Sequence, residues 1–272
     1  MTNEQFLLNE NNNSAPASAI DKDKISSAFS NSASSYDSGA ALQRRVGNKL
    51  LERQQPVIQL MDLGTGPGYF TSALADKSSG LIGVDIAPQM LEFAKARNQH
   101  INVNWLLGDA ESLPLDTESV DGIFSSLMLQ WVHDLSKALS EAYRVLTPGS
   151  EFHFSTLLDG TLYELASAWR QVDDLQHINS FLTELALKEV IEQSQFELSS
   201  YTNQAEVLYY NSALELMRDL KAIGANNTAA KSQGLMGRST LRKIQQGYEV
   251  FRTERGLSAT YQVAYCSLKK PV

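Results

Sequence analysis

The chain has 272 residues with a net charge of −8, and its 43% hydrophobic and 20% charged residues are ordinary proportions for a globular protein. A chain of this length holds either one full-sized α/β domain with insertions or two small domains. It has no apolar run near the roughly 20 residues that cross a bilayer, no signal peptide pattern at its start, and one cysteine, Cys266, which excludes an internal disulfide. We therefore expect a cytoplasmic protein that does not bind a membrane.

The N-terminal region divides into two parts. Residues 1–24 are rich in Asn, Ser, Ala and charged side chains and lack apolar periodicity, so we expect them to be disordered. A helical pattern begins at Ile25 and continues to about residue 51, and Pro56 ends that segment. Residues 25–272 are expected to form a single domain.

Short apolar runs alternate with amphipathic stretches in the next hundred residues. The pattern predicts helices at 69–76, 88–98 and 135–146 between strands at 57–63, 80–85, 101–107, 120–126 and 151–157. Strands and helices that alternate at this spacing form parallel βαβ units. We therefore expect a Rossmann-like, doubly wound and mostly parallel sheet with an N-terminal helix against it.

The regular alternation of strand and helix patterns ends after residue 157. Helical patterns cover 161–175, 182–193, 213–223 and 240–253, and strand patterns cover 196–210 and 260–268, which brings the expected sheet to seven strands. We predict that the helical insertions near 158–181 and 211–256 form a lid over the sheet.

A glycine-rich turn follows the first expected strand and carries most of the functional information. Its glycines, Gly64, Gly66 and Gly68, follow the spacing G-x-G-x-G, whereas a dinucleotide enzyme has G-x-G-x-x-G and a helix N-terminus aimed at a pyrophosphate. Pro67 removes a backbone donor from the turn. Asp62 is poorly placed for a diphosphate but suits an ammonium group. The turn therefore favours S-adenosylmethionine over NAD.

Three further elements agree with that cofactor. Asp85 ends the second strand, 21 residues after Gly64, where a carboxylate can accept both ribose hydroxyls. Asp109 follows the third strand and is expected to accept from the adenine amino group, and the fourth strand ends beside the reactive methyl. The predicted cofactor-binding residues are Asp62, Gly64, Thr65, Gly66, Gly68, Asp85, Ile86, Met90, Asp109, Ala110 and Ser126.

These four elements, in this order and spacing, resemble the class I S-adenosylmethionine-dependent methyltransferases over about residues 25–157. One departure lies before the fifth strand, where the family commonly has two glycines and this chain has Gly149 and Ser150. That loop is distant from the expected site.

The flanking segments carry a narrower resemblance. Residues 29–37, 41–44, 216–226, 234–238 and 259–263 are similar to the malonyl-acyl carrier protein O-methyltransferases of biotin synthesis. The segment Leu220-Lys221-Ala222-Ile223-Gly224-Ala225 is the part most specific to that family. The resemblance thus covers nearly the whole chain after its first 24 residues.

This resemblance implies methyl transfer to the free carboxylate of a malonyl thioester on acyl carrier protein, an early step toward the pimelate moiety of biotin. A carboxylic acid titrates near pH 4, so the nucleophile is already ionised at pH 7 and no general base is required. By resemblance, Tyr36 and Lys221 are candidates for positioning the substrate. A tyrosine packed at the helix–sheet boundary and a surface lysine are the plain alternatives for these two residues.

The basic residues gather toward the C-terminus. Residues 201–272 contain ten Lys and Arg but five Asp and Glu, a local net charge of +5 in a chain of net charge −8. Solvated helix faces account for such a distribution, and so does docking of an acidic partner. By resemblance the partner is malonyl-acyl carrier protein, and the residues expected to meet it are Arg218, Arg238, Arg242 and Lys243.

Two other functions stay open. One is methylation of another small molecule, such as a free dicarboxylate or a quinone-ring carbon; a carbon acceptor needs a general base, and His133 near the methyl would favour it. The other is a cofactor-binding module that acts through a partner, against which the intact Asp62, Asp85 and Asp109 argue. The four scattered histidines predict no metal site, and the basic residues lack the interleaved aromatics of a nucleic-acid-binding module.

Overall fold

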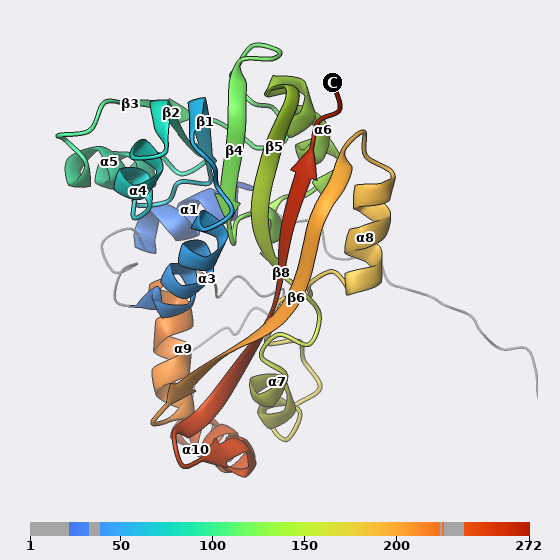
Figure 1. Cartoon of the computed structure of the whole chain (residues 1–272). Helices are drawn as coiled ribbons and strands as arrows, with labels where there is room; N and C mark the ends of the chain where they lie inside the picture. Colours follow the sequence, from blue (N-terminus) through green and yellow to red (C-terminus); the bar gives the residue numbers. More distant parts are fainter. Residues whose placement is uncertain (1–21, 33–38, 224, 226–236) are drawn as a thin grey trace, which may run out of the picture.

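The computed structural model describes residues 22–32, 39–223, 225 and 237–272, and a twisted central sheet runs through it (Figure 1). The sheet has the order β3-β2-β1-β4-β5-β8-β6, in which the first five strands are parallel and β8 is antiparallel to both of its neighbours. Its long strands are β1 (Val57–Leu63), β2 (Ser78–Asp85), β3 (Val103–Leu107), β4 (Val120–Ser126), β5 (Leu146–Leu157), β6 (Glu197–Tyr210) and β8 (Gly256–Lys269).

The expected Rossmann-like, mostly parallel sheet is confirmed, with one correction to its strand count. The seven predicted strands are the seven of the continuous order, but among the described residues an eighth strand, β7 (Arg252–Thr253), pairs with β8. Two residues are too few to give a periodic pattern, so the sequence does not reveal β7.

Helices cover both faces of the sheet because successive strand residues point to opposite sides. On one face α6 (Leu135–Val145) and α8 (Glu184–Glu192) pack over Met61 and Ile123. On the other face α3 (Ala41–Leu51) and α4 (Thr71–Ala75) pack over Leu60 and Phe124. The short helices η1 (Leu129–Trp131) and η2 (Glu249–Phe251) follow β4 and precede β7.

The strands β6 and β8 form a ribbon, 14 residues long in each strand, that extends beyond the parallel part of the sheet (Figure 1). Its far end carries α7 (Tyr163–Trp169), α9 (Ala213–Ala222) and α10 (Arg238–Tyr248), and α10 packs against both other helices. These helices come from the two stretches in which the lid insertions are predicted.

The N-terminal helix begins earlier than its sequence pattern indicates. Helix α1 (Lys22–Ser32) includes residues 22–24, which we expected to be disordered, and it packs against α5 (Pro88–Arg97). The rest of that expected disordered region lies outside the described residues. None of the helices that the structure describes is long and apolar enough to cross a membrane.

A buried carboxylate attaches α7 to the sheet where β5 leaves it. Pairing of β5 with β8 ends at Leu157 and Val263. Beyond that point, Glu164 Oε2 accepts from the Thr260 backbone N at 3.1 Å and Oε1 accepts from the Thr260 hydroxyl. Glu164 is fully buried. The Glu164 side chain therefore adds to the backbone hydrogen bonds between this segment and β8, which run from Leu158 N to Gln262 O and from Leu162 N to Thr260 O.

The variant Thr260→Val tests this attachment because it keeps the side-chain shape and removes one of the two donors to Glu164. We expect the free energy of unfolding to fall by about 1–3 kcal/mol, the cost of leaving a buried carboxylate oxygen without its partner. Urea denaturation measures it, with Ser167→Ala as the control because the Ser167 hydroxyl bonds to Tyr163 O at an exposed place on α7. A change for Thr260→Val no larger than that of the control would contradict the attachment.

Candidate functional site

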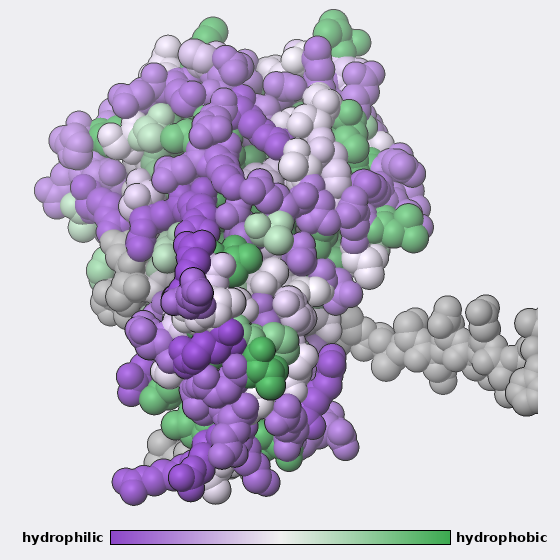
Figure 2. Space-filling view, turned by 60° about the horizontal axis from the view of Figure 1, so that its bottom comes forward, coloured by the Kyte–Doolittle hydropathy of each residue, from purple (hydrophilic) through white to green (hydrophobic). Residues whose placement is uncertain are grey.

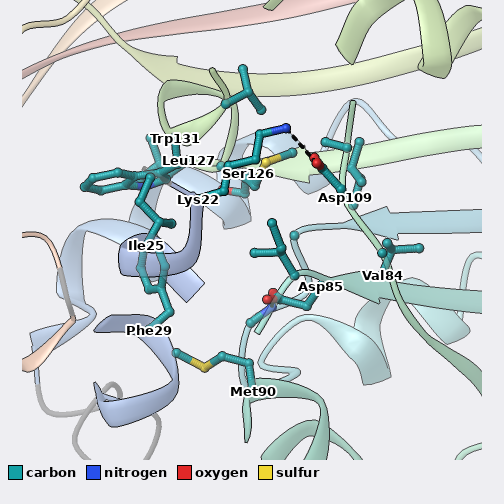
Figure 3. A pocket seen from close by; sticks show the side chains of 18 residues that line it. Lys22, Ile25, Phe29, Val84, Asp85, Met90, Asp109, Ser126, Leu127 and Trp131 are labelled. Carbon is teal, nitrogen blue, oxygen red and sulfur yellow. Dashed lines mark hydrogen bonds and ion pairs between the residues drawn. The ribbon is translucent and has the colours of Figure 1, made fainter. Parts of the chain in front are cut away.

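A cavity lies at the carboxyl ends of β1, β2 and β4, beneath α1 (Figure 3). Counted with its open mouth it encloses about 740 Å³ of space outside the protein atoms. Eight of the eleven predicted cofactor residues line it: Gly64, Gly66, Asp85, Ile86, Met90, Asp109, Ala110 and Ser126.

The three glycines of the turn share a positive φ but have different surroundings. Gly64, Gly66 and Gly68 have φ angles of 78°, 54° and 72°, which favour glycine. A Cβ at Gly64 would lie 2.3 Å from Met128 Cγ, whereas a Cβ at Gly66 would have no atom within 4 Å. Gly66 therefore borders open space in the cavity wall. A Cβ at Gly68 would lie 2.6 Å from Asn98 Nδ2, so this glycine allows close packing and does not line the cavity.

The carboxylate of Asp85 is held between the glycine turn and the start of α5. Its Oδ2 accepts from Gly66 N and its Oδ1 accepts from Ala87 N, both at 2.8 Å. Burial raises the pKa of Asp85 to about 6, although these backbone hydrogen bonds lower it. Because each carboxylate oxygen can accept a second hydrogen bond, Asp85 in the cavity wall can accept from two ligand hydroxyls.

Asp62 and Thr65 lie one layer behind the cavity wall, as Gly68 does. Asp62 is buried, and Thr65 Oγ1 donates to its Oδ2 at 2.7 Å. Burial raises the pKa of Asp62 to about 7, the Thr65 hydrogen bond opposes this rise, and repulsion from Asp85 adds to it. Among the described residues, no basic side chain forms an ion pair with Asp62 or Asp85. The site is therefore suited to a cationic ligand.

Helix α1 and the turn after β4 supply wall residues that sequence reasoning missed. Ile25 and Phe29 of α1 line the cavity, and the Phe29 ring meets the Trp131 ring edge-on, with centroids 5.4 Å apart. Trp131, in the turn after β4, lines the cavity too. Lys22 donates to Asp109 Oδ2 at 2.6 Å (Figure 3). No motif marks Lys22, which precedes the helical pattern that begins at Ile25.

The two predicted substrate-positioning residues have different outcomes. Tyr36 lies outside the described residues. Lys221 is exposed in the last turn of α9, and the structure does not place it in the cavity wall. Gly39, the first described residue after position 38, lies against α9, because a Cβ there would be 2.7 Å from Asp219 O. The chain that enters α3 thus borders the helix that carries Lys221.

The predicted docking residues lie at the end of the β6–β8 ribbon. Arg218 is exposed on α9, and Arg238, Arg242 and Lys243 are exposed on α10, which has no acidic residue. We call these four residues the α9–α10 basic patch. Figure 2 turns this end of the molecule toward the viewer and shows a largely hydrophilic surface.

The histidines take no part in the cavity. His133 is exposed and its backbone N donates to Glu111 Oε1 at 2.7 Å. His153 is buried against Ser267, and burial lowers its pKa. In the part of the chain that the structure describes, no group of three or more His, Cys, Asp or Glu side chains is arranged to hold a metal ion.

Comparison with known proteins agrees with the geometry. Residues 61–154 match the family described as methyltransferase domain. The chain is 40% identical over 249 residues to the malonyl-acyl carrier protein O-methyltransferase of Serratia marcescens, covering 90% of this chain and 95% of that protein. It belongs to the malonyl-acyl carrier protein O-methyltransferase family. The match to the enzyme of Hahella chejuensis (strain KCTC 2396) is 37% identical and covers 91% of this chain and 90% of that protein.

A longer relative also matches. The chain is 41% identical over 260 residues to the biotin biosynthesis bifunctional protein BioHC of Cellvibrio japonicus (strain Ueda107), covering 94% of this chain. It spans about half the length of this relative and of the BioHC protein of Teredinibacter turnerae (strain ATCC 39867 / T7901), 51% and 48%.

Solved structures share the fold of this family member. The YcgJ protein of Bacillus subtilis has a TM-score of 0.57 at 18% identity, covering 84% of this chain and 100% of that one. The geranyl diphosphate C-methyltransferase of Streptomyces coelicolor A3(2), solved with S-adenosyl-L-homocysteine among its ligands, has a TM-score of 0.52 at 12% identity and covers 85% and 78%. At these identities the likeness shows the fold alone.

The raised pKa of Asp62 makes the free energy of unfolding depend on pH, and the substitution Asp62→Asn should remove this dependence. The folded state holds this proton up to about pH 7, whereas the unfolded state releases it near pH 4, so stability falls as the pH rises through that interval. Between pH 5.5 and 8 the contribution of Asp62 to the free energy of unfolding should fall by about 1–2 kcal/mol.

Denaturant titrations at both pH values measure this difference. Asp62→Asn should gain stability relative to the wild type at pH 8 but little at pH 5.5, because Asn keeps an acceptor for Thr65 without a charge. The control Asp76→Asn changes an exposed carboxylate after α4 and should follow the wild type. If the free energy of unfolding changed with pH in the same way for the wild type and Asp62→Asn, the predicted contribution of Asp62 would be contradicted.

Proposed function

We propose that this chain transfers a methyl group from S-adenosylmethionine to the free carboxylate of a malonyl thioester on acyl carrier protein. The product methyl ester masks a charge, so that fatty-acid enzymes can extend the chain toward the pimelate moiety of biotin. The family membership supports this activity, since relatives with 37% and 40% identity are named malonyl-acyl carrier protein O-methyltransferase. A cytoplasmic location stays a prediction that accompanies it.

The cavity supports the choice of cofactor. Asp85 offers acceptors for ribose hydroxyls, and the apolar side chains of Ile86 and Met90 line the wall beside it. The Asp85 carboxylate in the wall and the Asp62 carboxyl group behind it have no basic partner in the described chain, and a cationic ammonium group at the other end of the cofactor would favour their charged forms. When bound, the cofactor supplies an electrophilic methyl group on a sulfonium.

One observation supports a carboxylate as the acceptor. No histidine, cysteine or tyrosine is among the described residues that line the cavity. Its two carboxylates, Asp85 and Asp109, are engaged by backbone N–H groups and by Lys22, so this lining favours an acceptor that needs no general base. A carboxylate needs none because it is ionised at pH 7. The work of this chain is then to align the carboxylate with the methyl group and to exclude water, which Phe29, Leu127 and Trp131 promote with their apolar surface.

Methyl transfer from labelled S-adenosylmethionine tests the proposed function. We expect label in a base-labile ester of malonyl-acyl carrier protein, and little in free malonate or aconitate. Asp85→Ala should lower kcat/KM for S-adenosylmethionine by about 10- to 100-fold, because it removes charged hydrogen-bond acceptors from the cavity wall. No transfer to the carrier-linked malonyl group would reject the proposed function, and transfer to aconitate alone would favour the free dicarboxylate alternative.

The α9–α10 basic patch is the surface that we propose for the carrier protein. Arg238 and Arg242 are four residues apart on α10 and therefore share one helix face. Charged side chains of this kind mainly raise the rate of association with an acidic partner, and salt screens the attraction between exposed charges. The proposed patch lies at the ribbon end where α9 and α10 meet.

Charge reversal at this face should slow the reaction with malonyl-acyl carrier protein. For Arg238→Glu combined with Arg242→Glu we expect kcat/KM to fall by about 10-fold at 50 mM salt and by much less at 500 mM. The control combines Lys95→Glu and Lys137→Glu, exposed positions on α5 and α6 that change the net charge equally. The docking proposal fails if both pairs of substitutions have the same effect, or if salt leaves the defect unchanged.

A further inference from the structure

Helix α1 contacts three of the four loops that line the cavity, those after β2, β3 and β4. Ser26 Oγ donates to the backbone oxygen of Ile86 at 3.0 Å, after β2. Lys22 bonds to Asp109 in the loop after β3, and the Phe29 ring packs against Trp131 after β4. The three contacting side chains lie along one helix, which spans the cavity as a roof (Figure 3).

Lys22 pairs with two carboxylates at once. Its Nζ lies 2.6 Å from Asp109 Oδ2 and 2.9 Å from Glu111 Oε2. The Glu111 side chain is only 5% exposed, and the Lys22 side chain is 30% exposed. Ion pairs with a buried partner matter more than exposed pairs, because removal of the cation leaves a buried charge uncompensated.

The rest of the network fixes both carboxylates. Asp109 Oδ1 accepts from Glu111 N at 3.0 Å, so its two oxygens are held on opposite sides. Glu111 Oε1 accepts from the backbone N of His133 at 2.7 Å and of Asp134 at 3.2 Å. Glu111 therefore joins the loop after β3 to the loop after β4, and Lys22 adds α1 to that junction.

The protonation state of Lys22 suits this arrangement. Burial by itself lowers the pKa of Lys22, but the hydrogen bonds and charges of Asp109 and Glu111 outweigh that effect and raise it. The lysine is thus a cation wherever the two carboxylates are ionised, and it offsets the repulsion between two acids that both lie within 3 Å of its Nζ.

We propose that Lys22 is a cofactor-positioning residue, which holds α1 over the bound ligand and fixes the Asp109 carboxylate in the cavity wall. The identity of the ligand rests on the proposed function, but the ion pairs do not. Release of the ligand past α1 then requires both ion pairs to break. Salt weakens partly exposed ion pairs but not the apolar contacts of Ile25 and Phe29, so the contribution of Lys22 can be separated from theirs.

Dissociation of S-adenosylhomocysteine is the direct test, followed by stopped-flow tryptophan fluorescence, because Trp131 lines the cavity. In Lys22→Met we expect dissociation about 10-fold faster at 100 mM salt, equivalent to about 1.4 kcal/mol. Salt should accelerate dissociation from the wild type and have much less effect on the variant. Lys22→Arg should stay within a few-fold of the wild type, and the control Lys95→Met, on the exposed side of α5, should equal it.

Hydrogen exchange separates an effect on α1 from an effect on Asp109 alone. Amides of residues 22–32 should exchange faster in Lys22→Met than in the wild type, with or without ligand, while amides of α5 should not change. Glu111→Gln should shift both readouts in the same direction, since it removes one ion pair, keeps an acceptor for His133 and Asp134, and alters no residue of the cavity wall.

The outcomes of these experiments separate failure of the inference about Lys22 from failure of the proposed function. Unchanged dissociation in Lys22→Met, or a salt effect equal to that of the wild type, overturns the inference, and so does faster dissociation with unchanged exchange of α1. Failure of S-adenosylhomocysteine to bind the wild type would instead reject the proposed function. The exchange of α1 without ligand would still decide whether Lys22 holds the helix.

Discussion

β1 pairs in parallel with β2 on one side and with β4 on the other, and the position of the site depends on this pairing. In register, Asp62 lies opposite Gly83 of β2 and opposite Phe124 of β4. The carboxyl ends of the three strands therefore lie at the same edge of the sheet. From β1 the chain continues to β2 and β3 on one side, and it then crosses back to β4 on the other side of β1. Such a reversal of strand order leaves a crevice at the sheet edge, where the loops after the strands can surround a ligand.

The parts of the fold and site that follow from short-range patterns were predictable. Glycine spacing and a preceding strand place Gly64, Gly66 and Asp85 correctly at this edge, because a βαβ unit fixes their relative positions within a few residues. Spacing does not tell on which side of the turn a residue lies, and this is why Asp62 and Gly68 are behind the wall instead of in it.

Contacts between distant segments were not predictable. Lys22 and Asp109 are 87 residues apart, and their pairing depends on how α1 crosses the folded sheet, which no local pattern encodes. The same holds for Phe29 and Trp131, which look like ordinary core residues in the sequence. Glu111 lies between Ala110 and Ser112 without a motif of its own, although it links two loops and a helix.

The site accumulates acidic groups at a cost to the folded state. Asp62 and Asp85 both have raised pKa values because burial disfavours their charged forms. A protein selected for stability alone would not place two such groups next to each other. A bound cation relieves this unfavourable arrangement, so stability and ligand affinity are linked through the same two carboxylates.

The contact between Glu164 and Thr260 marks a seam in the architecture. On one side, the parallel strands are joined by backbone pairing, which tolerates little change in register. On the other side, the segment after β5 is attached to β8 at a few separate points. Leu158 N donates to Gln262 O at 2.8 Å, Leu162 N donates to Thr260 O at 2.6 Å, and Glu164 accepts from Thr260. A segment attached in this way can change its length or sequence while the cofactor half of the molecule keeps its shape. The seam thus divides a part of the fold that must stay constant from a part that is free to adapt to different acceptors.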